Sequence, residues 1–245
     1  MHTAVYKIAD KAVQITSVFE SVHRLCREYR WDGPADFTAN VTQDDIARER
    51  AIGAREDERE GLPIRQNSDE YWESLAVYRK IAEHMLDFDT VLFHGSALAM
   101  DGVGYLFTAK SGTGKSTHTR LWRQAFGDRV VMVNDDKPLL KITDSGVFVC
   151  GTPWDGVHRL SSNVILPLKA ICLLERGPRN NIVPICAKEA LPMLLQQSYR
   201  SPNPARMLKL MELMNRLTQQ LKFYRLTCNM EPEAALTAWD GIAKS

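Results

Sequence analysis

The chain has 245 residues, of which 44% are hydrophobic and 25% are charged, as is typical of a soluble protein with one sizeable core. Lys and Arg number 31 and Asp and Glu 30, which excludes an overall basic field that would attract nucleic acid. The apolar runs are too short to span a bilayer, and the N-terminus lacks the hydrophobic stretch of a signal peptide. We therefore expect a cytoplasmic protein with neither a nucleic acid nor a membrane as its partner.

The five cysteines are an odd number, are widely scattered and include no C-x-x-C pair. This spacing favours buried reduced thiols over a metal site or a redox site. Reduced thiols also agree with the expected cytoplasmic location.

The first part of the chain, residues 1–66, is predicted to form a small β-containing region. Short β-like runs occur at residues 12–18 and 36–41. The segment from Thr42 to Asp45 has the pattern of a capping box, which predicts that a charged helix begins there.

The rest of the chain, residues 67–245, begins with an amphipathic helix and then mixes strands with helices, which predicts an α/β fold around a central sheet. Asp101 and Gly102 suit a type I′ turn that joins two strands in a hairpin. The predicted strands lie at residues 91–93, 105–107, 130–133, 146–150, 169–174, 182–185 and 223–226. We expect this part to be the catalytic domain.

A glycine-rich segment follows the second predicted strand and opens a predicted helix. It matches the phosphate-loop (Walker A) pattern, with Ala109 in place of the usual first glycine. Gly112 and Gly114 can take backbone angles closed to other residues, so that successive N–H groups turn toward phosphate oxygens. Lys115 can then bridge the β- and γ-phosphates, and the Ser116 hydroxyl can ligate Mg²⁺. The predicted nucleotide-binding residues are Ala109, Lys110, Ser111, Gly112, Thr113, Gly114, Lys115, Ser116 and Thr117.

Two further elements carry candidate chemistry. Asp135 and Asp136 end a predicted strand that should pair beside the phosphate-loop strand, where one carboxylate can hold a metal while the other takes a proton. His94 is expected on the strand whose hairpin partner leads into the phosphate loop, which brings the imidazole toward the phosphates. Both elements have simpler interpretations, namely a solvated turn for the aspartates and a structural role for the histidine.

Taken together, the segments at residues 94–97, 111–117 and 134–136 resemble the catalytic domain of HPr kinase/phosphorylase. They resemble ATP-dependent phosphoenolpyruvate carboxykinase more distantly. In both families a histidine-bearing strand, a short hairpin and the phosphate loop come in this order, and an Asp-Asp pair follows. The resemblance implies a phosphoenolpyruvate carboxykinase/HPr kinase-like P-loop core with a mixed β-sheet and flanking helices.

The same resemblance implies roles for individual residues. Lys115 would hold the transferred phosphoryl group, and Ser116 with Asp136 would bind Mg²⁺. Asp135 would be the general base, and His94 would lie near the γ-phosphate. Because HPr kinases assemble as oligomers, homo-oligomer formation is a further expectation.

The chain also departs from these relatives. The segment that follows the phosphate loop, residues 117–120, lacks the acidic continuation usual in HPr kinase, and that family's second signature is absent. The loop at residues 151–159 admits two interpretations: Trp154 and Arg159 either bind substrate or belong to a structural turn with a packed tryptophan. For Glu175 and Arg176 we expect an ion pair at a sheet edge.

The function predicted from the sequence is a Mg²⁺- and ATP-dependent kinase. It would transfer the γ-phosphoryl group to a hydroxyl, either a serine of a protein or peptide or a group on a small metabolite. One alternative is a carboxykinase-like lyase, which would form phosphoenolpyruvate from oxaloacetate and ATP. The other is a non-catalytic nucleotide sensor, which would bind ATP without transferring phosphate and without needing Asp135.

Overall fold

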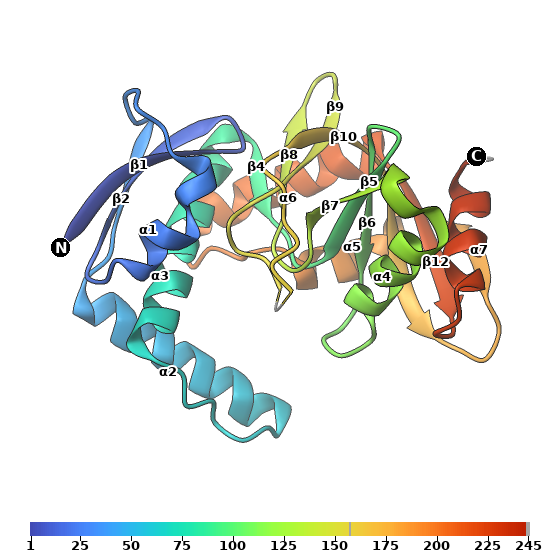
Figure 1. Ribbon diagram of the computed structural model, residues 1–245, viewed down its shortest axis with the longest axis horizontal. Helices are drawn as coiled ribbons and strands as arrows, with labels where there is room; N and C mark the ends of the chain where they lie inside the picture. Colours follow the sequence, from blue (N-terminus) through green and yellow to red (C-terminus); the bar gives the residue numbers. More distant parts are fainter. Residues whose placement is uncertain (157, 244–245) are drawn as a thin grey trace. The chain divides into compact units, whose positions relative to one another are not determined.

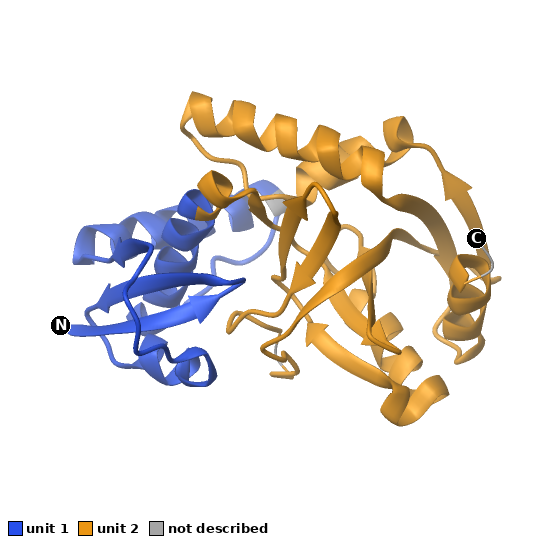
Figure 2. Cartoon of the chain, turned by 90° about the horizontal axis from the view of Figure 1, so that it is seen from above, with its two compact units in different colours: residues 1–84 blue, residues 85–245 orange. Residues whose placement is uncertain are grey.

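A computed structural model describes residues 1–156 and 158–243 of the chain. The chain divides into two compact units, Met1–His84 and Met85–Ser245 (Figure 2). The division falls after His84 and not between residues 66 and 67, where the sequence analysis put it.

The helix α3 (Asp69–Met85) explains this later division, because it packs within the first unit. Arg79 on α3 donates two hydrogen bonds of 2.6 Å to the buried carboxylate of Glu49. The ring of Trp72 lies so close to Gly53 that a Cβ at that glycine would lie 2.5 Å from it. The helix that opens residues 67–245 therefore belongs to the first unit.

The first unit contains a three-stranded sheet in the order β1-β2-β3. Its strands are β1 (His2–Ile8), β2 (Lys11–Ser17) and β3 (Phe37–Asn40). Ala9 and Asp10 both have positive φ angles, as the tight turn between the antiparallel strands β1 and β2 requires. The short helix α1 (Ser21–Leu25) and a 3-10 turn (Arg27–Tyr29) connect β2 to β3, which pairs parallel to β2.

The helix α2 (Gln43–Glu60) begins at the predicted capping box. The Asp45 N–H donates to the Thr42 hydroxyl, and the Thr42 N–H donates to the Asp45 carboxylate at 3.0 Å. Gly61 ends the helix with a φ of 69°, in the left-handed region that favours glycine.

The second unit is built on a mixed sheet of nine strands among the described residues. Its main order is β4-β8-β9-β10-β6-β5-β7, and β12 pairs with β10 and β11 (Figure 1). The strands are β4 (Thr90–Leu92), β5 (Ser96–Met100), β6 (Val103–Thr108), β7 (Val130–Asn134), β8 (Leu139–Thr143), β9 (Gly146–Cys150), β10 (Ile165–Arg176), β11 (Asn181–Ile185) and β12 (Lys222–Cys228). The predicted mixed α/β fold is confirmed at this level.

The strand β10 joins two parts of this sheet. Its first residues pair antiparallel with β9, and from Leu168 it pairs parallel with β6, with a register shift between Leu168 and Ala170. Its other edge pairs parallel with β12 over Ala170–Arg176. The carboxyl ends of β6, β10 and β12 therefore lie at one edge of the sheet.

Side chains alternate between two hydrophobic cores on the faces of this sheet. On β6, Leu106 enters one core, while Tyr105 and Phe107 enter the other. The first core is completed by the helices α5 (Ala187–Gln197) and α6 (Pro204–Gln220), and the second by α4 (Lys115–Phe126) and α7 (Glu233–Ala243). Two helical layers thus cover the sheet (Figure 1).

Two expectations about the strands need correction. His94 does not lie on a strand of the hairpin, because β4 ends at Leu92 and β5 begins at Ser96, so that His94 sits in the link between them. The strand that ends in Asn134 pairs with β5 and not directly with β6. The predicted hairpin turn is confirmed, since Asp101 and Gly102 both have positive φ angles between β5 and β6.

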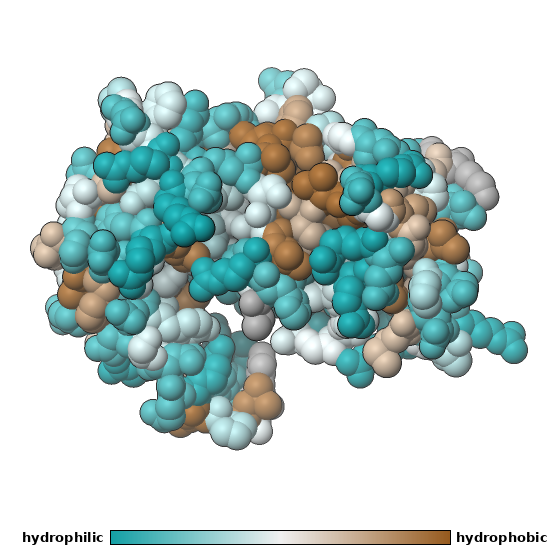
Figure 3. Space-filling model, in the orientation of Figure 1, coloured by the Kyte–Doolittle hydropathy of each residue, from teal (hydrophilic) through white to brown (hydrophobic). Residues whose placement is uncertain are grey.

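Hydrophilic residues cover most of the face drawn in Figure 3, and hydrophobic residues occupy a smaller part of it. Within the described part of the chain, every helix is too short or too polar to cross a bilayer.

Candidate functional site

The glycine-rich segment forms the connection between β6 and α4. Gly112 and Gly114 have φ angles of 73° and 119°, and Gly114 is the N-cap of α4. A Cβ at Gly112 would find open space, and one at Gly114 would make only an ordinary contact of 3.9 Å with Thr117, so the backbone angle and not crowding favours glycine here. The first N–H groups of a helix lack intrahelical acceptors, and here they border a loop that turns on two glycines. This is the geometry that an anion-binding loop needs.

Lys115 is buried at the first turn of α4. Its Nζ donates a hydrogen bond of 3.2 Å to the carbonyl oxygen of Ala109, which folds the side chain back over the loop. Burial lowers the pKa of Lys115, and the nearby carboxylates of Asp136 and Asp135 oppose that shift. The ammonium group and both carboxylates therefore interact electrostatically in one place.

Asp135 follows β7 and is buried. The Ser96 hydroxyl donates to its Oδ1 at 2.8 Å, and the Ser96 and Thr119 oxygens lie 2.9 Å apart. The Ser96 proton is used on the carboxylate, and the Thr119 hydroxyl beside it also lies 3.2 Å from the Ser116 carbonyl oxygen, to which it can donate. The Ser96 hydroxyl on β5 and the Thr119 hydroxyl on α4 thus form a chain that positions Oδ1 of Asp135. Oδ2 of Asp135 is not part of this chain of hydroxyls.

Asp136 lies between two basic side chains. Its Oδ2 is 3.0 Å from the Lys137 Nζ, and its Oδ1 is 3.4 Å from the His94 Nε2. Burial raises the pKa of Asp136, but the charge and hydrogen bond of Lys137, with the neighbouring His94 and Lys115 side chains, outweigh burial and leave the pKa below its ordinary value. Asp136 is therefore a carboxylate at neutral pH.

The imidazole of His94 has a pKa below its ordinary value, first because it is partly buried and second because Lys115 is near. Asp136 opposes this shift only in part. The backbone around His94 is fixed on both sides, since its N–H donates to the Gln197 carbonyl and its carbonyl accepts from the Thr108 hydroxyl. His94 is therefore neutral at neutral pH.

Asn134 joins the aspartate turn to the following loop and is fully buried. Its Oδ1 accepts from the N–H groups of Asp136 and Lys137 at 2.9 and 2.7 Å. Its Nδ2 donates to both oxygens of Thr152 and to the Trp154 carbonyl. The Asn134 side chain thus fixes the course of the backbone after β7.

The loop at residues 151–159 is only partly within the described chain, because Val157 lies outside it. Trp154 is buried, so of the two interpretations the packed tryptophan is correct and an exposed recognition platform is not. Gly156 lies against Asp135, where a Cβ would be 2.9 Å from Oδ2. Arg159 is exposed and has a φ of 52°, which is uncommon for a residue with a side chain.

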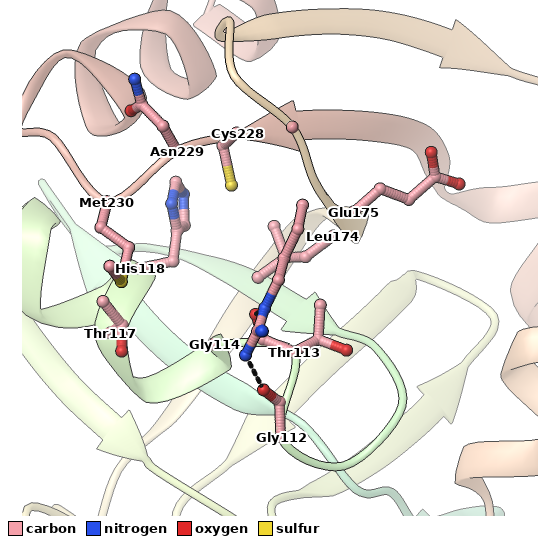
Figure 4. Close-up of a pocket in the computed structure, with 12 residues that line it drawn as sticks. Gly112, Thr113, Gly114, Thr117, His118, Leu174, Glu175, Cys228, Asn229 and Met230 are labelled. Carbon is pink, nitrogen blue, oxygen red and sulfur yellow. Dashed lines mark hydrogen bonds between the residues drawn. The ribbon is translucent and has the colours of Figure 1, made fainter.

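A pocket of about 640 Å³ lies beside the loop, between the start of α4 and the ends of β10 and β12 (Figure 4). Gly112, Gly114 and Thr117 line one side, and Leu174 and the segment from Cys228 to Met230 line the other. A second pocket of about 540 Å³ lies along Lys110 and Ser111. Cavities of this size are typical of small-molecule sites.

Arg176, the last residue of β10, connects the two sides. Its Nε donates to the Thr113 carbonyl at 3.1 Å, and its Nη2 donates to the Gly112 carbonyl. The expected ion pair at the sheet edge involves Glu175 instead, which lies 3.2 Å from Arg225 on β12.

The structure therefore brings His94, Lys115, Asp135 and Asp136 into one cluster. Ser116 and Thr117 lie on the first turn of α4, Ser116 exposed and Thr117 half-buried. Sequence reasoning missed Ser96, Thr119 and Arg176, because each acts across a tertiary contact without a motif of its own. Across residues 1–156 and 158–243, no three His, Cys, Asp or Glu side chains gather in a way suited to a metal ion.

Comparisons with known proteins add little to this geometry. No family model matches the sequence, and no curated protein matches it. Among solved structures, the chain is similar to the HPr(Ser) kinase/phosphatase from Coxiella burnetii at 15% sequence identity. That match covers 52% of this chain and 88% of the other, with a TM-score of 0.29.

Proposed function

We propose that the protein is a Mg²⁺- and ATP-dependent kinase that transfers the γ-phosphoryl group to a hydroxyl. The observation that carries this proposal is the buried Lys115, at the N-terminus of α4, interacting with two adjacent carboxylates. A lysine in a glycine-rich loop suits the phosphates of a nucleotide, and paired carboxylates suit a metal and a general base. The acceptor is a serine of a protein or peptide, or a hydroxyl on a small metabolite.

In this proposal the loop at residues 109–114 and the first turn of α4 bind the triphosphate. The N–H groups at the helix start donate to phosphate oxygens, and the positive end of the helix dipole favours the same anion. Lys115 supplies a charge next to the group that moves. The 640 Å³ pocket on the Thr117 side has room for the nucleoside.

Ser116 and Asp136 would hold Mg²⁺, which when bound neutralises charge on the phosphate oxygens. The residues present fit this ion. Asp136 is a carboxylate at neutral pH, because its pKa lies below the ordinary value, with Lys137 as the largest cause that opposes burial. Magnesium usually takes one or two protein oxygens and completes its shell with water and phosphate, so two such residues are enough.

Asp135 would accept the proton of the acceptor hydroxyl. Its Oδ1 already accepts from Ser96, so Oδ2 is the oxygen left for this task. As the acceptor oxygen bonds to the γ-phosphorus, the bond from that phosphorus to the β–γ bridging oxygen breaks, and ADP leaves. Because His94 is neutral, it adds no charge that would compete with Lys115. Positioning and electrostatic stabilisation supply most of the rate in such reactions.

The test compares the wild type with Asp135→Asn, using γ-labelled ATP, Mg²⁺ and a cell extract of the organism that encodes the protein. We expect a labelled protein, peptide or metabolite with the wild type only, while both forms bind ATP equally. Asp128→Asn is the matched control, because Asp128 is exposed at the end of α4. Equal ATP binding without transfer by either form would favour a nucleotide sensor. Formation of phosphoenolpyruvate from oxaloacetate would favour a carboxykinase.

A further inference from the structure

The side chain of Arg176 reaches from the end of β10 to the glycine-rich loop, 64 residues earlier in the sequence. It donates to two consecutive carbonyl groups, those of Gly112 and Thr113. A guanidinium group presents its donors in a rigid planar fork, which suits two neighbouring acceptors. The contact therefore defines the orientation of two successive peptide groups.

Each peptide group is planar and trans, so its N–H points away from its C=O. Because Arg176 holds the Gly112 carbonyl, the Thr113 N–H points away from Arg176, and it donates to Lys110 at 3.3 Å. Because Arg176 also holds the Thr113 carbonyl, the Gly114 N–H points away from it too. Arg176 thus determines, from outside the loop, where the donors of the loop point.

The loop has few other restraints on these two peptides. Gly112 and Gly114 flank them, and glycine loses more conformational entropy on ordering than any other residue. Within the described part of the chain, no carboxylate forms an ion pair with Arg176, and its neighbour Glu175 pairs with Arg225. Its two hydrogen bonds to the loop are therefore its main polar interaction.

Arg176 also lies between the two pockets along the loop, since it lines both of them with Gly112, Thr113 and Leu174. The guanidinium thus spans the space between the sheet edge and the loop.

We propose that Arg176 is a positioning residue, which pre-orders the loop so that the Gly114 N–H faces the phosphates of the nucleotide. This inference rests on the proposed function, because it needs a nucleotide on the loop. Removing the fork would leave the loop free to rotate its peptides, and phosphate binding would then include the cost of ordering them.

The experiment measures the dissociation constants of ATP and of inorganic tripolyphosphate for the wild type, Arg176→Met, Arg176→Lys and the control Arg179→Met. Arg179 is exposed on the turn after β10, so its substitution removes the same charge at a site away from the loop. For Arg176→Met we expect the affinities for both ligands to fall by about the same factor, roughly tenfold for two lost hydrogen bonds. Arg176→Lys should recover only part of this loss, because an ammonium group lacks the planar fork.

Steady-state kinetics provide a second measurement. KM for ATP should rise in Arg176→Met by a larger factor than kcat falls, while the melting temperature stays near that of Arg179→Met. Unchanged affinity for both ligands would overturn the inference, and so would weaker ATP binding with unchanged tripolyphosphate binding, which would place Arg176 on the nucleoside. A wild type that binds neither ligand would overturn the proposed function as well.

Discussion

The Ser96 hydroxyl donates a 2.8 Å hydrogen bond to Oδ1 of Asp135, and both residues are buried. Ser96 is the first residue of β5, and Asp135 follows the end of β7, which pairs with β5. Thr119 on α4 completes the chain of hydroxyls at 2.9 Å. Sheet and helix together thus fix the orientation of the carboxylate that we propose as the general base.

Replacing Ser96 by Ala should lower kcat by about tenfold with little change in the affinity for ATP. The substitution removes one hydrogen bond to a charged group. In the wild type this bond keeps Oδ2 of Asp135 directed at the acceptor. The measurement is single-turnover transfer of labelled phosphate at saturating ATP. Ser145→Ala, in the exposed turn between β8 and β9, is the control and should leave the rate unchanged. Transfer at the wild-type rate in Ser96→Ala would remove Ser96 from the site.

Replacing Asn134 by Asp should lower the free energy of unfolding by about 3 kcal/mol or more. The aspartate keeps the oxygen that accepts from Asp136 and Lys137, but it lacks the Nδ2 donors to Thr152 and Trp154. An oxygen would then face those carbonyl groups inside the protein.

Urea unfolding of Asn134→Asp provides the measurement, with the midpoint as the readout. Asn215→Asp, exposed on α6, makes the same chemical change at a surface position and should shift the midpoint little. Equal midpoints for the two variants would show that the bonds of Asn134 contribute little to stability.

Local signals explain the parts of the fold that the sequence predicted. The capping box at Thr42 and the hairpin at Asp101 and Gly102 each depend on residues within a few positions of one another, so a short window contains the whole interaction. The alternation of apolar residues likewise identified β9, β11 and β12. It did not identify β1, β5 or β8.

The rest depends on which strands become neighbours, and the sequence does not encode this in any short pattern. Ser96 reaches Asp135 only because β5 lies between β6 and β7. Arg176 reaches the loop only because β10 pairs parallel with β6. Trp154 looked equally suited to packing and to recognition, and the surrounding contacts decided for packing.

Gly112→Ala and Gly61→Ala form a matched pair that separates backbone strain from ligand binding. Both glycines have left-handed φ angles, 73° and 69°, and a Cβ at either would meet open space. Each substitution should therefore cost about 1 kcal/mol of stability through its backbone conformation alone. Only Gly112→Ala should also weaken the binding of ATP, because it changes the loop that we propose to bind phosphate.

The measurement combines thermal unfolding with ATP titration on both variants. Similar decreases in melting temperature, with a loss of ATP affinity of about tenfold in Gly112→Ala alone, are expected. Unchanged ATP affinity in Gly112→Ala would argue against phosphate binding by the loop.

His118 lies on α4 next to the candidate site and should make the protein less stable in acid. Its ring is buried, and burial lowers its pKa to about 3. The Trp122 indole donates to its Nε2, so the neutral ring carries its proton on Nδ1. When the pH falls below about 6.5, the unfolded chain binds a proton at this histidine and the native state does not until about pH 3.

Because the pKa of His118 is lowered in the native state, protons bind preferentially to the unfolded chain. His118 therefore leaves the free energy of unfolding unchanged above about pH 6.5 and lowers it by up to about 1.4 kcal/mol per pH unit below that. His118→Gln keeps an acceptor for Trp122 but does not titrate. Urea unfolding at several pH values between 7.5 and 4.5 should therefore show the wild type losing stability faster than this variant as the pH falls.

A second variant, His118→Leu, controls for the acceptor. It should be less stable than His118→Gln at every pH, because the Trp122 N–H is left without its partner. Its stability relative to the wild type should nevertheless change with pH by the same amount as that of His118→Gln. A difference from the wild type that stays constant with pH in both variants would mean that His118 takes up its proton in the native state at an ordinary pH, and that its surroundings admit the charge.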